Sequence, residues 1–143
     1  SSIVKKQMSD KIFFDTNVLV YCYTETEPMK KTIAQALAQS PDAWASTQVL
    51  QELSNTLHKK FGKTWAEIDL TVEEVCQNFA VFINQPETVR GAIRTAERYK
   101  YSFYDSLILS SCLAIGCKTV YSEDMKNGQV IDGTLEIKNP FLP

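Results

Sequence analysis

KIFFDTNVLVY, residues 11–21, is the stretch that decides the fold of this 143-residue chain. Its three consecutive apolar residues, Ile12, Phe13 and Phe14, predict a short strand covered on both faces, as in a parallel sheet. Asp15 ends that strand, and the polar residues Thr16 and Asn17 precede an apolar run that predicts a helix. A strand, a turn and a helix in this order predict an α/β fold with helices on both sides of a sheet.

The remaining sequence continues the alternation of strands and helices. Helices are predicted by apolar residues at helical spacing and by prolines at helix starts, and strands by short apolar runs. The expected helices cover residues 28–40, 47–61, 64–83, 86–99 and 105–116, and the further strands 42–46, 118–122 and 135–139. The expected order is β-α-α-β-α-α-α-α-β-β, in a single domain over residues 11–143. Residues 1–10, which do not begin with Met, are interpreted as an N-terminal extension or a cloning remnant.

Composition excludes several classes of protein and of site. A hydrophobic content of 44% with only five Gly and five Pro predicts a folded, globular chain. A net charge of -2 provides no overall positive field, so nucleic acid could bind only at a local patch. The four cysteines form no C-x-x-C pair and are interpreted as reduced core thiols, and His58 is the only histidine. No apolar run reaches the roughly 18 residues of a membrane span, so a cytoplasmic protein is expected.

Four acidic residues are expected to converge at one edge of the predicted sheet. In open α/β sheets the functional crevice lies beyond the carboxyl ends of the strands. Asp15 ends the first strand, Glu52 follows the second, Asp105 begins the apolar helix and Asp124 follows the third strand. Two carboxylates ~4 Å apart repel by about 4 kcal/mol at an effective dielectric near 20, so the cluster requires a cation. Mg²⁺ or Mn²⁺ suits an oxygen-only site and supports hydrolysis of a phosphodiester by metal-activated water.

Each of these acids also has a purely structural interpretation. Asp15 and Asp105 each precede an apolar helical run, where Asp is a common N-cap. Asp124 lies in a polar turn and could simply be solvated. Glu52 stands beside Leu53 on a core-facing helix, where a buried carboxylate needs a partner. The inference therefore depends on the joint placement of the four residues.

The segments FFDTNVLVY, VLQELSNTL, YSFYDSLILSSC and VYSEDMKNGQ resemble, in this order, the motifs of PIN-domain nucleases over about residues 11–141. The resemblance is closest to the VapC-like toxins of VapBC toxin-antitoxin modules. It implies a three-layer α/β/α fold with a short, mainly parallel sheet, and a metal-dependent endoribonuclease whose ligands fall on Asp15, Glu52, Asp105 and Asp124. It also implies that Asn17 and Ser122 support these ligands through hydrogen bonds, with Glu123 as the alternative fourth acid. An RNA substrate, a cognate antitoxin and a homodimer are implied as well.

Two basic groups are candidates for contacting RNA. Arg90, Arg94 and Arg98 recur every four residues and predict a stripe on one side of their helix, although Glu87 and Glu97 lie nearby in the sequence. Lys59 and Lys60, with Lys63, cluster at the end of the Glu52 helix, where cations also complement the helix dipole.

Aromatic residues beside Asp105 are a further candidate contact. Tyr101 and Tyr104 have rings that could stack on unpaired bases or pack in the core. An alternative function from another class is a catalytically silent PIN scaffold that binds nucleic acid or protein. The retention of all four acids favours the enzyme.

Overall fold

The strand expected at Phe13 lies in the middle of a parallel sheet. The structure is a computed structural model that describes residues 10–143. Within these residues the elements follow one another as β1 (Ile12–Phe14), α2 (Thr16–Cys22), α3 (Pro28–Leu37), β2 (Ala43–Ser46), α4 (Thr47–Lys59), α5 (Trp65–Asn78), β3 (Ala80–Phe82), α6 (Pro86–Tyr99), α7 (Phe103–Ile115), β4 (Thr119–Tyr121), β5 (Val130–Ile131) and β6 (Leu135–Lys138). The six strands form one sheet in the order β3-β2-β1-β4-β6-β5.

The sheet is parallel except for its last pair. Phe13 of β1 is paired in register with Trp44 of β2 on one side and Val120 of β4 on the other. Only β5 runs antiparallel to its neighbour β6. The chain leaves β1 toward β2 and β3 and later returns to β4 on the other side of β1, so the strand order reverses between β1 and β4. A reversal of this kind is where open α/β sheets form their functional crevice.

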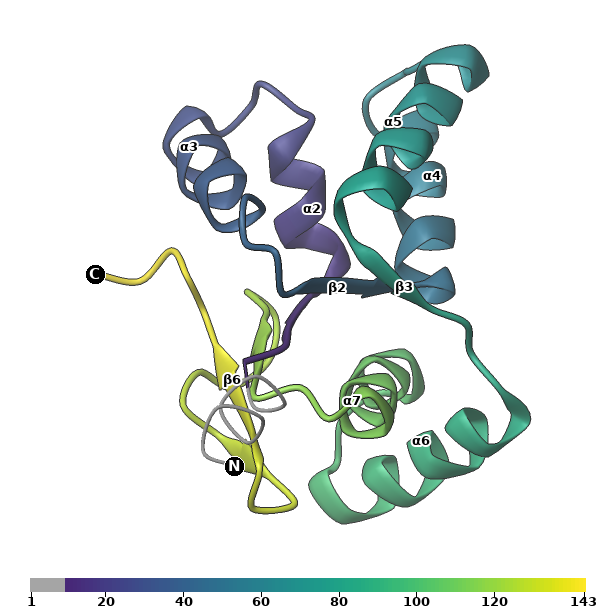
Figure 1. Ribbon diagram of the computed structural model, residues 1–143, viewed down its shortest axis with the longest axis vertical. Coiled ribbons are helices and arrows are strands. Elements are labelled where there is room, and N and C mark those ends of the chain that lie inside the picture. Colours follow the sequence, from purple (N-terminus) through teal and green to yellow (C-terminus); the bar gives the residue numbers. More distant parts are fainter. Residues whose placement is uncertain (1–9) are drawn as a thin grey trace.

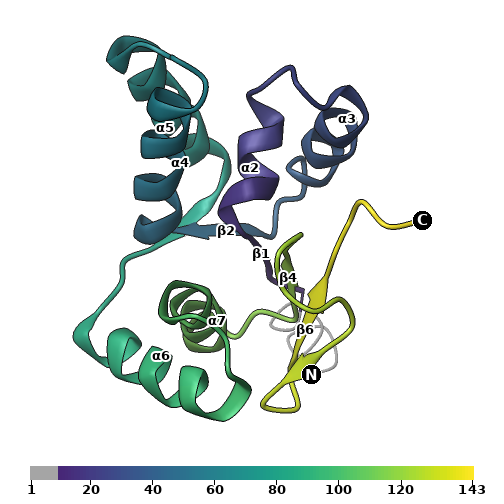
Figure 2. The same ribbon diagram turned by 180° about the vertical axis from the view of Figure 1, so that it is seen from behind.

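Helices cover both faces of the sheet, as Figures 1 and 2 show. The helices α2 to α5 lie on one face, and α6 with α7 lies on the other. Phe13 and Phe14 are fully buried, which explains why β1 is an uninterrupted apolar run. The three-layer α/β/α arrangement with a mainly parallel sheet is therefore confirmed.

Two strands were not expected from the sequence. The helix expected over 64–83 ends at Asn78 in α5, because the backbone is extended at Phe79 (ψ 147°), and β3 then pairs with β2. The short strand β5 was also missed, since Val130 and Ile131 stand alone among polar turn residues. The expectation of four consecutive helices after β2 is therefore wrong: β3 lies between α5 and α6, and β5 lies between β4 and β6.

The remaining sequence-based expectations have mixed outcomes. Cys22, Cys112 and Cys117 are buried free thiols, but Cys76 is exposed on α5, so its assignment to the core is wrong. Across residues 10–143, no helix combines the length and apolar character needed to cross a bilayer. Except for Asp10, the segment interpreted as an N-terminal extension lies outside the described residues.

Candidate active site

One pocket of about 290 Å³ is lined by all four of the acids singled out from the sequence. Asp15 follows β1 and Asp124 follows β4, so both lie beyond the carboxyl ends of neighbouring strands. Glu52 projects from α4, and Asp105 from the first turn of α7. The other lining residues are Thr16, Asn17, Asn55, Thr56, Tyr104 and Ile108. Among residues 10–143, no Lys or Arg lines the pocket, so the described lining is acidic.

Asp15 is the most buried of the four acids, with 6% of its surface exposed. Its Oδ1 accepts a hydrogen bond from the Thr16 backbone N–H at 2.7 Å, and its Oδ2 accepts one from the Ser122 hydroxyl at 2.9 Å. The pKa of Asp15 is raised from 3.8 to about 7, chiefly by burial and to a smaller extent by the charges of Asp105 and Asp124, which together outweigh the lowering effect of the two hydrogen bonds. Asp15 is also the N-cap of α2, so the structural interpretation and a role in the pocket are compatible.

Asp105 does not cap the helix it stands on. Ser102 is the N-cap of α7, and its hydroxyl accepts the Asp105 backbone N–H at 3.2 Å. The helix consequently begins at Phe103, two residues earlier than expected from the sequence. Burial raises the pKa of the Asp105 carboxyl, the charge of Asp124 raises it further, and the hydrogen bond with Ser102 lowers it. The carboxylate is therefore available to the pocket.

Glu52 is connected to the Asp15 segment through a threonine. The Thr16 hydroxyl donates to Glu52 Oε1 at 2.6 Å, while the Thr16 backbone N–H contacts Asp15. Ser46 caps the start of α4 by accepting the Val49 backbone N–H, which fixes the orientation of the helix relative to β2. Thr16 was not recognised from the sequence as a site residue, because its side-chain contact spans 36 positions along the chain.

The loop that carries Asp124 is attached to the pocket by two polar side chains. The Ser122 hydroxyl, while donating to Asp15, accepts the backbone N–H groups of Asp124 and Met125 at 3.2 and 3.3 Å. The Asn17 amide donates to Asp124 Oδ2 at 2.6 Å. Ser122, just after β4, thus contacts Asp15 and the backbone of Asp124. Asn17, at the start of α2, contacts the Asp124 carboxylate.

Glu123 points away from the pocket, although it adjoins Asp124. Its carboxylate accepts hydrogen bonds from the Tyr21 hydroxyl and from the Lys30 ammonium group. Burial acts to raise the pKa of Glu123, but the hydrogen bonds from Lys30 and Tyr21 outweigh it and hold the pKa below its usual value. The Tyr21 ring packs edge-on against Phe141 at 5.2 Å, which ties this loop to the C-terminal segment. Glu123 therefore has a structural set of partners of its own.

The donor chemistry of the pocket suits a hard divalent cation. Its ligating groups are carboxylate, hydroxyl and amide oxygens, which Mg²⁺ and Mn²⁺ prefer, and no Lys or Arg of the described residues lines the pocket beside the carboxylates. Among the described residues, no three Asp, Glu, His or Cys side chains are already spaced to hold one ion. The residues present fit a metal that keeps several waters and takes few protein ligands, which is the habit of Mg²⁺.

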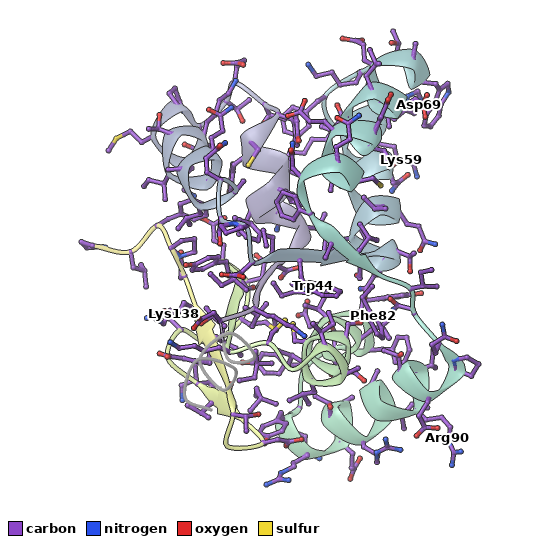
Figure 3. All side chains as sticks on the ribbon, in the orientation of Figure 1. Trp44, Lys59, Asp69, Phe82, Arg90 and Lys138 are labelled. Atoms are coloured by element: carbon purple, nitrogen blue, oxygen red, sulfur yellow. The ribbon has the colours of Figure 1, made fainter. Side chains whose placement is uncertain are left out.

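The two basic groups lie on different parts of the molecule, as Figure 3 shows for Lys59 and Arg90. Arg90 and Arg94 approach Glu87 at 3.8 and 3.4 Å, and Arg98 approaches Asp132 at 3.5 Å. None of these arginines lines the acidic pocket. Lys59 and Lys60 are exposed near the end of α4, the helix that carries Glu52.

The two tyrosines differ in their surroundings. The Tyr101 hydroxyl donates to Gln129 and accepts the Lys126 backbone N–H, so Tyr101 has a structural role. Tyr104 lines the pocket and is 64% exposed, packed edge-on against Phe103. Of the two, only Tyr104 presents its ring beside the acids.

The sequence of this chain was compared with models of known protein families. The family model described as the PIN domain matches residues 12–128, which includes all four acids. The chain belongs to the PIN-domain family. Nucleases of this family generally use divalent metal ions. No curated protein sequence matches the chain closely enough to count as a relative.

The solved structures with a similar fold include a toxin and a toxin-antitoxin complex. VapC20 of Mycobacterium tuberculosis, described as a sarcin-ricin loop cleaving toxin, is 19% identical, with 80% of this chain and 90% of that chain covered and a TM-score of 0.67. A toxin-antitoxin complex from Klebsiella pneumoniae is 16% identical, with 92% and 98% covered and a TM-score of 0.69. VapBC2 of Rickettsia felis, bound to a promoter DNA fragment, is 18% identical, with 88% and 97% covered and a TM-score of 0.64. At these identities the similarity establishes the fold.

Proposed function

We propose that this PIN-domain protein is a metal-dependent endoribonuclease that hydrolyses RNA phosphodiester bonds, with Mg²⁺ or Mn²⁺ held by Asp15, Glu52, Asp105 and Asp124. One observation carries the proposal: acids from four separate segments line a single pocket to which the described part of the chain contributes no Lys or Arg. Such a cluster is electrostatically unfavourable unless a cation binds there. Burial and, to a smaller extent, the charges of Asp105 and Asp124 raise the pKa of Asp15, so its ionised form is disfavoured until a cation binds.

The residues of the pocket have separable tasks in this proposal. A divalent ion, when bound, supplies positive charge that polarises the phosphoryl group and makes water nucleophilic near neutral pH. Thr16 holds Glu52, and Ser122 holds Asp15 together with the backbone of the Asp124 loop, so the carboxylates are oriented before any ligand arrives. Tyr104 lies at the pocket with an exposed ring that suits stacking on an unpaired base.

We further propose that the chain is the toxin of a toxin-antitoxin pair and acts as a homodimer in the cytoplasm, where cellular RNA is encountered. The fold supports this assignment, because VapC20 and toxin-antitoxin complexes share it over most of their length. Induced expression is expected to halt growth, and co-expression of the small neighbouring reading frame is expected to restore it. Growth arrest that persists with every residue of the pocket replaced would contradict the assignment.

The enzymatic proposal is tested by incubating the purified protein with structured and single-stranded RNA in Mg²⁺, in Mn²⁺ and in excess chelator. Cleavage is expected with either metal and absent in chelator, because the acids alone cannot neutralise the developing charge. Equal cleavage in chelator would disprove the metal dependence. Intact binding without cleavage under every metal condition would instead favour the silent scaffold.

Substitutions of the adjacent acids Asp124 and Glu123 are expected to affect different properties: cleavage for Asp124 and stability for Glu123. Asp124→Asn is expected to weaken cleavage by about tenfold or more, because Asp124 lines the pocket and contacts Asn17. Glu123→Gln is expected to leave kcat almost unchanged and to lower stability instead, because its partners are Tyr21 and Lys30. Rate measurements at saturating Mg²⁺, with thermal melting of both variants, check the pair. The reverse order of effects would assign the fourth acid to Glu123.

A further inference from the structure

The tip of the hairpin formed by α4 and α5 carries an exposed pair of stacked aromatic rings. Trp65 is 63% exposed, and its ring lies 3.9 Å from that of His58 at an interplanar angle of 19°. A single exposed apolar side chain is ordinary on a protein surface, but the Trp65 ring is distinguished by its parallel stack on a second exposed ring. The geometry is that of a stacking surface with one face still open to solvent.

The turn between the two helices holds this pair in place. Gly62 adopts a left-handed backbone (φ +65°), which allows the Lys63 backbone N–H to reach the Leu57 carbonyl at 3.0 Å. His58 donates from its ring to the Lys63 carbonyl at 3.2 Å, and Thr64 caps α5 with Glu67 in a reciprocal pair of hydrogen bonds. Because the turn is already ordered, the protein loses little conformational entropy when a ligand stacks on these rings.

Three lysines lie in the segment that joins the two stacked residues along the chain. Lys59, Lys60 and Lys63 lie between His58 and Trp65 in the sequence, and none forms an ion pair of 4 Å or less with any residue in the range 10–143. The arginines of α6 differ, because each approaches a carboxylate. Hydrogen bonds from Thr64 and the charge of Lys63 lower the pKa of the neighbouring Glu67 carboxyl, so one carboxylate acts on this cluster at longer range. The cluster therefore offers cations without close ion-pair partners near an exposed ring.

The cluster is continuous with the acidic pocket along α4. Asn55 lines the pocket, and His58 and Lys59 follow it by three and four residues, so they are its neighbours on the helix surface. Six residues of helix separate Glu52 from His58, a rise of about 9 Å. Figures 1 and 2 show α4 extending from the sheet edge to the tip of the hairpin.

We propose that the Trp65–His58 stack, with Lys59, Lys60 and Lys63, binds an unpaired base and the adjoining phosphates of the RNA strand whose scissile bond enters the acidic pocket. The inference rests on the proposed nuclease function for the identity of the strand. Proteins that bind single-stranded nucleic acid combine exposed aromatic rings with cations. Any base can stack on the ring, and the Lys side chains pair with the phosphates. A protein partner fits less well, because the apolar surface here is one ring edged by charges rather than a continuous groove.

Binding is measured in excess chelator, so that the test does not depend on cleavage. The chain has two tryptophans, and Trp44→Phe leaves Trp65 as the only fluorophore of its kind. Single-stranded oligouridylate is expected to quench Trp65 emission, with weaker binding at high salt because phosphate contacts release counterions. An emission spectrum unchanged at saturating RNA would overturn the proposal.

Substitutions separate stacking from simple apolar contact. Trp65→Leu is expected to weaken RNA binding about 5- to 150-fold, the value of one stacked base, whereas Trp65→Phe retains most of the affinity. Leu70→Ala, which removes a comparably exposed apolar side chain from the same helix, is the control and is expected to bind normally. Equal affinity of Trp65→Leu and the parent, or loss of binding to a co-expressed antitoxin instead of RNA, would contradict the proposal.

The same variants distinguish failure of this inference from failure of the proposed function. In cleavage assays Trp65→Leu is expected to raise KM and leave kcat near its original value, because the stack lies away from the acids. RNA that quenches Trp65 without ever being cleaved would support the stacking surface and refute the nuclease. Normal metal-dependent cleavage with an unchanged KM in Trp65→Leu would support the nuclease and refute the stacking surface.

Discussion

Asp105→Asn is expected to lower the rate of RNA cleavage by at least about a hundredfold while leaving the protein folded. Replacing a group that merely orients a metal ligand already costs roughly 10- to 100-fold, so loss of a ligand charge should cost no less. The fold should tolerate the change, because Ser102 and not Asp105 caps α7. Single-turnover cleavage in saturating Mg²⁺ measures the rate, and circular dichroism verifies the helices.

The matched control for Asp105 is an acid at the opposite edge of the sheet. Asp42 lies just before β2, at the amino end of the strand, whereas the pocket lies beyond the carboxyl ends. Asp42→Asn removes the same charge and is expected to cleave RNA at the original rate. Equal losses in the two variants would show that net charge, and not the pocket, governs activity.

Asp15→Asn is expected to abolish cleavage and, in the absence of metal, to make the protein more stable at about pH 8. Burial raises the pKa of Asp15 from 3.8 to about 7, so between these values the folded protein holds a proton that the unfolded chain has released. Stability therefore falls as pH rises through this window, by about 4 kcal/mol in total. An asparagine stays neutral and escapes this loss, although exchanging the acceptor of the Ser122 hydroxyl costs about 1 kcal/mol.

Urea denaturation in chelator at several pH values checks this prediction. The free energy of unfolding of Asp15→Asn should exceed that of the parent by about 3 kcal/mol near pH 8, and the difference should shrink as pH falls and reverse to about 1 kcal/mol in favour of the parent below about pH 4. Added Mg²⁺ should stabilise the parent and not the variant, since only the parent retains the full set of carboxylates. A variant that is less stable than the parent at every pH would show that Asp15 is needed for structure rather than for a cation.

The sequence predicts the layers of this fold well because its helices and first strand carry strong periodic signals. Phe13 and Phe14 are buried on both faces, as the apolar run indicated. The strand β3 was missed because its three residues follow α5 with a single intervening residue and no Gly or Pro. Its conformation is decided by pairing with β2, a contact over more than 30 residues that local propensity does not contain.

The four acids of the candidate site could be predicted from the sequence, but most of their hydrogen-bond partners could not. Asp15 and Asp124 follow strands, Asp105 lies in the first turn of α7 and Glu52 in the second turn of α4, and all four line the pocket. The contact of Thr16 with Glu52 and the separate partners of Glu123 depend on side-chain directions that a sequence pattern does not fix. Asn55 and Thr56 could have been found, because they follow Glu52 by one helical turn.

A crystal structure of the protein soaked in Mn²⁺, with anomalous diffraction recorded to locate the metal, tests most directly whether these acids bind a cation. We expect an anomalous peak in the pocket, with some oxygens of Asp15, Asp105 and Asp124 or Glu52 at direct metal-ligand distances of about 2.0–2.2 Å and the others contacting the metal through water. The peak should disappear in Asp105→Asn. A fully soaked crystal with no peak between these carboxylates, or a peak held by other residues, would contradict the proposed metal site.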